Sequence, residues 1–560
     1  MEMKTFTLLR QLKKLKNVYG GDAAERKLDL LRKLTWPLKK APQVRRLHEF
    51  LCFLHAYPDS RSVLEQVEQM LASFGRRGDL RRFRRALADT GIAGTDIHYS
   101  FFWPTACWIV KRFPDYLTID WAKFTNKNKL EDLLPILLPY SESLSFDMLS
   151  FSPREWLNHL KGTGETDAAF LIRRFAALRV NSFTKEKLFE DLDVPMRITS
   201  GPDTPARTGA KLSGMSVVFQ TQPLSRTRPN LRQEIQKPPI GVRLLPPSEG
   251  QQFIDAAIEA MITRSRALDA FDYGDRNDVR LIDCGQGLMF ACIGQIPERR
   301  LMLETVYGFL TIKNGVPIGY VLTSSLFGSS EIAYNVFETY RGTEAAPIFG
   351  RVLAMARHVF GSDAFFIPPY QLGHDNTEGL KSGAWWFYYK LGFRPEDPEV
   401  RRLLKSELRL IKKNPQHRSS TKTLQKLSSE PLFLYLDRSK QKVHVKIPLE
   451  KVGLRISRLL ADRYGANREK AVQKLSHDAT KLLGVRTKRS WSAGERLAWE
   501  RWSPLIVMLP GISGWSPQEK RALVQVVRSK GGHRESDYLK LFNKHRRLQR
   551  AILKLAQESS

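Results

Sequence analysis

The stretch Asn335-Val336-Phe337-Glu338-Thr339-Tyr340-Arg341-Gly342-Thr343-Glu344-Ala345-Ala346 predicts a strand, a turn and the beginning of a helix. The first backbone N–H groups of a helix have no partner within it, and the helix dipole adds partial positive charge there. Such a helix end binds anions, and small residues in the turn let a phosphate approach the backbone. We therefore expect residues 341–346 to hold a pyrophosphate.

The segments around this stretch predict a mixed sheet. Asn314-Gly315 is a dipeptide that supplies two positive φ angles for a tight hairpin turn. A capping box over residues 248–251 predicts the start of a helix, and three further boxes are predicted outside this domain, at 152–155, 492–495 and 516–519. The other expected elements are strands over 306–312, 316–323, 331–337 and 364–368, and helices over 344–360 and 385–391. Their order predicts an α/β domain over residues 240–400.

Two motifs in this domain resemble those of the GNAT superfamily of N-acyltransferases. Arg341 and Ala346 match the first and last positions of the family's cofactor loop, (Arg/Gln)-x-x-Gly-x-(Gly/Ala), which lies between a strand and a helix. Glu344 replaces the middle glycine, and its carboxylate would repel a pyrophosphate unless the side chain points away. The segment 388–393, Tyr-Tyr-Lys-Leu-Gly-Phe, resembles the family's Tyr-x-Lys-x-Gly-Phe signature.

The resemblance implies an acyl-CoA co-substrate, most simply acetyl-CoA, whose acyl group passes directly to an amine without a metal. It implies that the strand residues bind the pantetheine arm and that the loop binds the pyrophosphate. The expected cofactor-binding residues are Asn335, Val336, Phe337, Arg341, Gly342, Thr343, Glu344, Ala345 and Ala346.

The resemblance also suggests the groups that move protons. Tyr388 corresponds to the tyrosine that protonates the departing thiolate, a task suited to a phenol with an ordinary pKa of about 10. A tyrosine in an aromatic helix can instead be a core residue. Glu331 and Glu338 are the candidate general bases, and a water molecule is the alternative.

The charge of the chain is unevenly distributed. The formal net charge is +32, with +24 in residues 401–560, +8 in residues 1–50 and −5 in residues 241–400. An acidic centre suits a cationic amine acceptor, while basic flanks suit a polyanion. We expect an α+β multidomain protein with a basic, helical region at 1–193, a linker at 194–239, the acyltransferase domain at 240–400 and a basic, mainly helical region at 401–560.

The C-terminal region admits two interpretations. Its basic residues could neutralise nucleic-acid phosphates while exposed tryptophans stack on bases. Alternatively, the tryptophans are core residues and the charges are solvated. The tryptophans concerned are Trp491, Trp499, Trp502 and Trp515.

Three function classes therefore remain open. The first is an acyl-CoA N-acyltransferase, the second a nucleic-acid-binding protein with a degenerate acyltransferase fold, and the third a transferase of this fold that uses aminoacyl-tRNA. No apolar run of 18 residues predicts a membrane span. Four scattered cysteines indicate a reducing compartment, so we expect a cytoplasmic protein.

Overall fold

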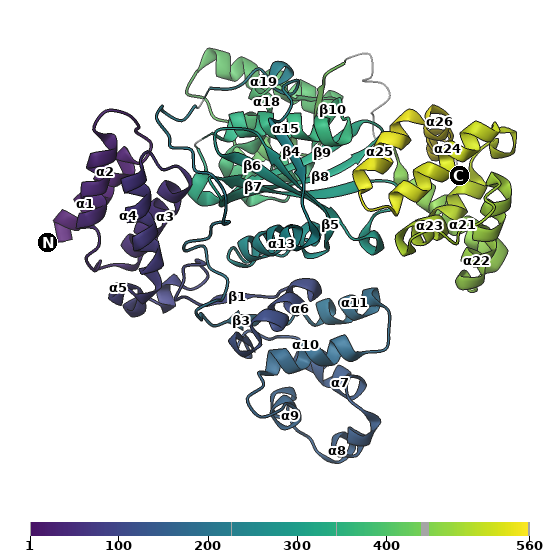
Figure 1. The fold of residues 1–560 in the computed structure, drawn as a ribbon, viewed down its shortest axis with the longest axis horizontal. Helices are drawn as coiled ribbons and strands as arrows, with labels where there is room; N and C mark the ends of the chain where they lie inside the picture. The colour runs from purple at the N-terminus through teal and green to yellow at the C-terminus, as the bar shows by residue number, and fades with distance from the viewer. Residues whose placement is uncertain (1, 226, 343, 438–446, 558–560) are drawn as a thin grey trace.

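The computed structural model describes the whole chain except residues 1, 226, 343, 438–446 and 558–560. A central sheet lies between an N-terminal region and a C-terminal helical region, which occupy opposite ends of the molecule (Figure 1). The predicted α+β multidomain class is confirmed.

The central sheet has nine strands in the order β11-β12-β10-β9-β8-β7-β6-β5-β4. Neighbouring strands are antiparallel except β9 and β10, which are parallel. The strands are β4 (Gly241–Leu244), β5 (Gly274–Asp283), β6 (Leu288–Gln295), β7 (Thr305–Lys313), β8 (Val316–Leu326), β9 (Ser329–Val336), β10 (Ala364–Ile367), β11 (Arg394–Pro395) and β12 (Leu432–Tyr435).

The expected elements around the quoted stretch are confirmed. Asn314 and Gly315 have φ angles of 51° and 83° in the turn between β7 and β8. Helix α15 (Ala345–Phe360) follows β9, and α18 (Ala384–Lys390) ends just before Gly392. Strands β4, β5 and β6 lie upstream of the predicted hairpin and were not predicted.

Helices α13 (Pro247–Ile262) and α15 cover opposite faces of the sheet (Figure 1). Side chains alternate between these faces along each strand. Tyr334 of β9 contacts Phe349 of α15, with ring centroids 5.4 Å apart. On the other face, Tyr320 of β8 contacts Phe271 of α14 (Asp269–Asp272) at 6.3 Å. We call these the α15 face and the α13 face.

Three of the four capping boxes are as expected. The serines at 152, 492 and 516 each cap their helix and exchange hydrogen bonds with a glutamate three residues on. The box predicted at Ser248 is wrong. Helix α13 begins at Pro247, so Ser248 lies within the first turn and cannot be the residue that caps it. Proline lacks an N–H, so a proline in the first turn already removes one of the donors that a cap would satisfy.

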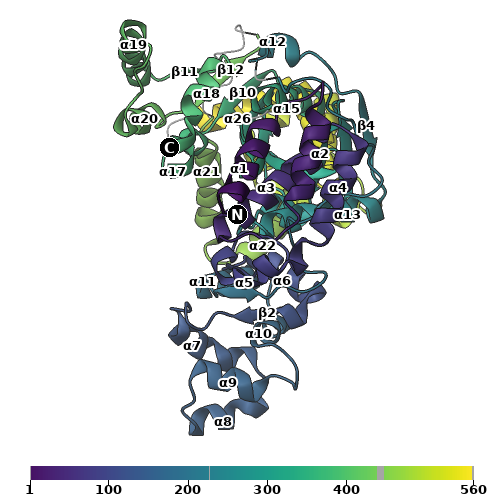
Figure 2. The ribbon, with the colours of Figure 1, turned by 90° about the vertical axis from the view of Figure 1, so that its left-hand side faces the viewer.

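The N-terminal region contains a sheet that the sequence patterns did not predict. Strands β1 (Ile97–Tyr99), β2 (Leu117–Ile119) and β3 (Met196–Ile198) form it in the order β1-β3-β2. A lobe with α7 (Lys127–Leu137), α8 (Ser143–Met148) and α9 (Pro153–Leu160) extends away from the central sheet (Figure 2). The remaining helices are α1 (Glu2–Leu15), α2 (Ala23–Lys33), α3 (Ala41–Ala56), α4 (Arg61–Ala72), α5 (Gly78–Arg82), α6 (Trp103–Arg112), α10 (Asp167–Ala177) and α11 (Ser182–Leu192).

The predicted linker is an irregular segment that is hydrogen-bonded on both sides. The Arg207 N–H donates to Gly91 in the N-terminal region at 2.7 Å. The Leu212 N–H donates to Gly315 in the central hairpin at 2.9 Å. The segment also contains β3 and the short α12 (Leu231–Glu234). It therefore connects the two regions by contact as well as by sequence.

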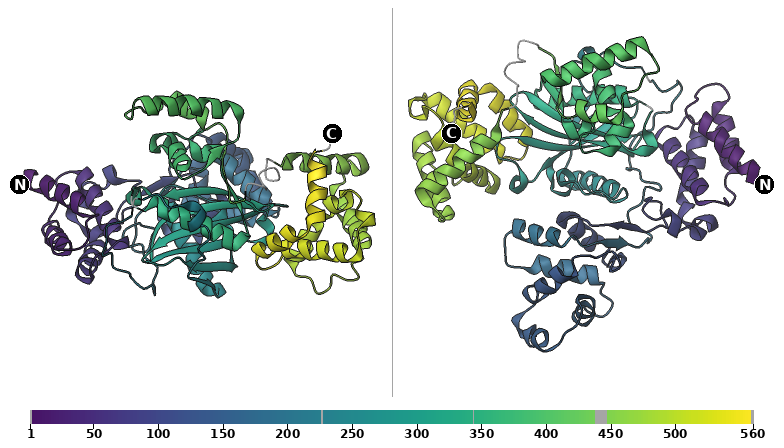
Figure 3. Two further views of the ribbon diagram at one scale, coloured as in Figure 1. Left: turned by 90° about the horizontal axis from the view of Figure 1, so that it is seen from above. Right: turned by 180° about the vertical axis from the view of Figure 1, so that it is seen from behind.

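The C-terminal region is helical beyond β12. Helices α19 (Pro398–Lys413) and α20 (Thr421–Leu427) project from the central sheet (Figure 3). Beyond them follow α21 (Leu449–Tyr464), α22 (Arg468–Leu483), α23 (Ala493–Met508), α24 (Pro517–Lys530), α25 (Glu535–Lys544) and α26 (Arg546–Gln557). The sequence also predicts that residues 443–447 form the second strand of a hairpin with residues 431–436; residues 443–446 lie outside the described residues.

The tryptophans of this region are core residues, so the second of the two interpretations is correct for them and the first, exposed stacking surfaces, is wrong. Their exposed fractions are 6% for Trp491, 0% for Trp499 and Trp502, and 4% for Trp515. Trp502 donates its indole N–H to the Met302 carbonyl at 2.8 Å, joining α23 to the loop before β7. The apolar surface of the indoles is used to pack helices.

Candidate functional site

A cavity of about 680 Å³ lies where β9 and β10 separate. The two strands pair only from Ser329 to Glu331 on β9, although β9 continues to Val336. Ala333 to Val336 line the cavity. So do Tyr388 from the α15 face and Tyr320 from the α13 face. The cavity therefore crosses the free edge of β9 and is lined by residues from both faces.

The free edge of β9 presents unpaired backbone groups to this cavity. The Phe337 N–H donates to the Ile318 carbonyl at 3.0 Å, so alternate residues Asn335 and Ala333 bond toward β8. The backbone groups of Tyr334 and Val336 consequently face the opposite side. Arg341 Nε donates to the Val336 carbonyl at 3.0 Å. An extended ligand could add to this edge as a further strand.

The loop after β9 leads directly into the first turn of α15. Gly342 has a φ of 76°, a conformation that favours glycine. Helix α15 begins at Ala345, and the side chain of its N-cap residue, Glu344, makes no hydrogen bond to the first turn. Gly342 and Ala345 line the cavity. Thr343, which was predicted to bind the cofactor, lies outside the described residues.

Glu344 does not line the cavity. Its carboxylate forms an ion pair at 3.2 Å with Lys313, a buried residue at the end of β7. The side chain therefore points away from the loop, the condition under which a glutamate at this position is compatible with a bound phosphate. The charge of Glu344 is compensated by Lys313.

The Arg341 guanidinium lies at the cavity wall and forms an ion pair with Glu378. Glu378 also pairs with Arg266 at 3.5 Å, and Arg266 donates to the Tyr320 hydroxyl at 2.8 Å. Two guanidiniums thus face Glu378, whose carboxylate is the one among the described residues that lines this cavity. The sequence patterns did not indicate Glu378, Arg266 or Tyr320, because these residues come from separate segments and belong to no motif.

Tyr388 is both a core residue and a cavity residue. Its side chain is 3% exposed and packs against Phe349 with ring centroids 5.3 Å apart. Burial raises the pKa of the Tyr388 phenol above its ordinary value. The hydroxyl therefore stays protonated at neutral pH, as a proton donor must, while the same shift makes it a weaker acid than an exposed phenol. None of the described residues forms a hydrogen bond with it.

The two predicted bases lie in different places. Glu331 is at the point where β9 and β10 part, and strand alternation places it on the α13 face with Asn335. Burial, and then the charge of Glu304, raise the pKa of Glu331. Glu338 is 76% exposed and ion-paired with Arg45 at 3.3 Å. Neither carboxylate lines the cavity. Glu331 lies two residues before Ala333, which does line it.

The remaining predicted residues also separate. Phe337 does not line the cavity. Its side chain is 2% exposed and packs against Arg264 and Tyr320. Asn335 lines the cavity, and its buried amide oxygen has no hydrogen-bond partner among the described residues. A buried unpaired acceptor at a cavity is a place where a ligand N–H can bind.

A second cavity of about 1140 Å³ adjoins the first at the N-terminus of α15. The two share Gly342, Ala345, Ser382 and Phe387. Ala346 lines the second cavity, whose outer wall comes from α19 and α20. Its basic and aromatic lining includes Arg228, Lys381, Trp386, Tyr389, Lys390 and Arg418. Together the cavities form a path from the free edge of β9 past α15 to a basic, aromatic compartment.

Comparisons with known proteins give no further assignment: no family model, curated protein or solved structure matches the chain. None of the helices in the described part of the chain is long and apolar enough to cross a membrane. Among the same residues, no cluster of three or more histidine, cysteine or acidic side chains could hold a metal ion.

Proposed function

We propose that residues 240–400 form a GNAT-like domain that transfers an acyl group, most simply acetyl, from a CoA thioester to an amine. The observation that carries the proposal is the free edge of β9, which opens into a cavity continuous with the N-terminus of α15. In acyl-CoA, the pantetheine arm with its two amides is followed by a pyrophosphate. The free strand edge, which can bond amides, is likewise followed by a helix N-terminus, which can bind an anion.

The donor would enter from the α15 face. Its pantetheine amides would bond the outward backbone groups of Tyr334 and Val336, as an added strand does. Its pyrophosphate would lie against Gly342, Ala345 and Ala346, where the helix dipole and free N–H groups favour negative charge. The basic and aromatic second cavity suits a phosphorylated nucleoside. Arg341 would exchange Glu378 for the phosphate.

The acceptor would enter from the α13 face. The amine nitrogen attacks the thioester carbonyl carbon, forming the C–N bond, and the C–S bond then breaks. Asn335 would accept a hydrogen bond from the amine through its unpaired amide oxygen. Glu331 would receive the ammonium proton through water, and Tyr388 would protonate the thiolate. Glu378 is the carboxylate placed to attract a cationic acceptor.

Binding of CoA tests this proposal. CoA should raise the melting temperature, because a ligand that binds only the folded state stabilises it. Arg341→Gln should abolish the rise, while Arg357→Gln, at an exposed position in the last turn of the same helix, should leave it unchanged. Tyr388→Phe should bind CoA normally and lose roughly 10- to 1000-fold in turnover. No shift at millimolar CoA would refute the acyl-CoA proposal.

A further inference from the structure

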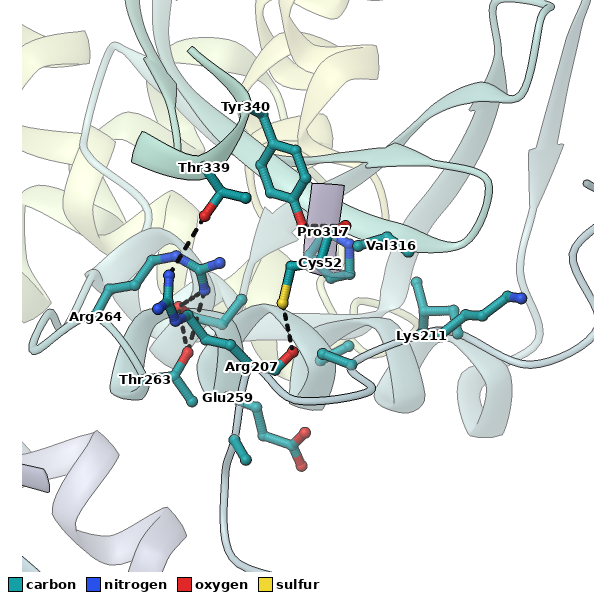
Figure 4. Close-up of a pocket in the computed structure, with 15 residues that line it drawn as sticks. Cys52, Arg207, Lys211, Glu259, Thr263, Arg264, Val316, Pro317, Thr339 and Tyr340 are labelled. Atoms are coloured by element: carbon teal, nitrogen blue, oxygen red, sulfur yellow. Dashed lines mark hydrogen bonds between the residues drawn. The ribbon is translucent and has the colours of Figure 1, made fainter. Parts of the chain in front are cut away.

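A small enclosed cavity of about 80 Å³ lies behind the loop that follows β9 (Figure 4). Its walls come from α3, the irregular segment 206–212, the end of α13 and the 3₁₀ turn η6 (Glu338–Tyr340). It is separate from the two cavities described above, with which it shares no lining residue. Its volume excludes a nucleotide.

Two guanidinium groups converge at this cavity. Arg207 donates to Glu49 at 2.5 Å and lies 3.5 Å from the Thr339 hydroxyl. Arg264 lies over the Phe337 ring at 3.5 Å and donates through one nitrogen to the Ala260 carbonyl at 2.8 Å. Figure 4 shows both guanidiniums beside Thr263. Two like charges are therefore held together in a largely buried place.

Carboxylates of the described residues compensate only one of these two charges. Glu49 pairs with Arg207, and no carboxylate among them lies within 4.0 Å of Arg264. The buried Nε of Arg207 has no hydrogen-bond acceptor there. Burial, and then the charge of Arg207, lower the pKa of Arg264 to about 9. A buried unpaired guanidinium is strongly unfavourable unless an anion or a proton-accepting partner is present.

The other charged side chains that line the cavity do not supply a counter-charge for Arg264. Lys211 is paired with Glu68 at 2.7 Å. The Glu259 carboxylate points away from the guanidiniums (Figure 4). Burial, and then the charge of Asp255, raise the pKa of Glu259. The cavity therefore has one unpaired donor, the Arg207 Nε, and a second guanidinium, that of Arg264, which donates only to uncharged oxygens.

We propose that this cavity binds one small inorganic anion, between chloride and phosphate in size, held by Arg207 and Arg264. The anion would connect α3, the segment 206–212 and the loop that carries Thr339. The proposal does not depend on whether acyl-CoA binds in the two cavities of the candidate site.

Crystals of the full chain soaked in sodium bromide would locate the anion by anomalous scattering. We expect a bromide peak between the guanidiniums of Arg207 and Arg264. Only water density there, with bromide bound elsewhere, would overturn the proposal.

Thermal melts at constant ionic strength would provide a second readout. Titrating phosphate or bromide against gluconate, which is too large for the cavity, should raise the melting temperature saturably, by about 2–4 °C. Arg264→Gln should remove the rise, and Arg264→Lys should keep part of it. Arg357→Gln is the exposed control. An unchanged rise in Arg264→Gln would refute the site; if that variant does not fold, the bromide position decides.

Discussion

The two flanking regions contact the central domain in different ways. The N-terminal region packs against the loop between β9 and α15, where Glu49 of α3 accepts a hydrogen bond from Thr339. Tyr99 of the same region lines the cavity at the free edge of β9. The C-terminal region packs against β5 and β7 through buried polar groups: the Glu535 N–H donates to the Asp278 carboxylate of β5, and the Ser536 N–H donates to the Tyr307 hydroxyl of β7. One junction is connected to the candidate site, and the other stabilises the sheet at a distance from it.

The largest effect is expected at the C-terminal junction. Lys530 is 3% exposed and paired with the fully buried Glu535 at 2.5 Å. Lys530→Met should leave that carboxylate without its main partner and cost about 3–5 kcal/mol in unfolding free energy. Urea denaturation would measure this, with the exposed Lys540→Met as control. CoA should still raise the melting temperature of the variant. Loss of that rise would mean that this junction, too, is connected to the site.

Removal of one carboxylate at the N-terminal junction should affect binding as well as stability. Glu49→Gln takes the charged partner from Arg207 and weakens the contact with Thr339. We expect a stability loss of about 1.5–3 kcal/mol and roughly 10-fold weaker CoA binding. Isothermal titration would measure the affinity, and Glu65→Gln, from an exposed pair, is the control. Unchanged CoA affinity would argue against coupling between α3 and the loop.

Acid should weaken the N-terminal junction more than the C-terminal one. Burial, and then Arg207, lower the pKa of His48 to about 3. Burial, and then Lys211, lower that of His55 to about 4. The unfolded chain binds these protons near pH 6.5 and the folded chain does not, so stability decreases as the pH falls below 6.5.

The expected loss at pH 5 is on the order of 1–2 kcal/mol for each histidine. Burial raises the pKa values of Asp278 and Glu535 at the other junction, which acts in the opposite direction. Melting curves between pH 7.5 and 5 would measure the effect, and His48→Gln should flatten the curve. An equally steep curve for that variant would show that His48 does not cause the acid sensitivity.

The smallest effect on stability is expected on the exposed face of α26. Replacing Arg546, Arg550 and Lys554 with glutamine should change unfolding by no more than about 0.5 kcal/mol. If this face binds nucleic acid, the triple variant should bind mixed-sequence RNA more weakly. The slope of the logarithm of the binding constant against the logarithm of the salt concentration should be smaller by about 1 for each lost phosphate contact. Failure of the unmodified full-length chain to bind RNA at low salt would show that these charges are only a solvated surface.

Local patterns predicted short-range features well. The Asn314-Gly315 turn, the strand–loop–helix around Arg341 and three capping boxes depend on residues within a few positions of one another. Their geometry follows from backbone conformation and hydrogen bonding, which adjacent residues specify.

Long-range packing decided the rest. Whether a tryptophan is exposed depends on the segments that pack over it, so Trp499 and Trp502 could not be placed by the charges beside them in sequence. The pairing of Glu344 with Lys313 joins residues 31 positions apart, and that of Arg341 with Glu378 joins residues 37 apart. The sequence by itself indicated the strand, turn and helix around Arg341. The tertiary structure determined which charges face them, because electrostatic partners are chosen by proximity in space.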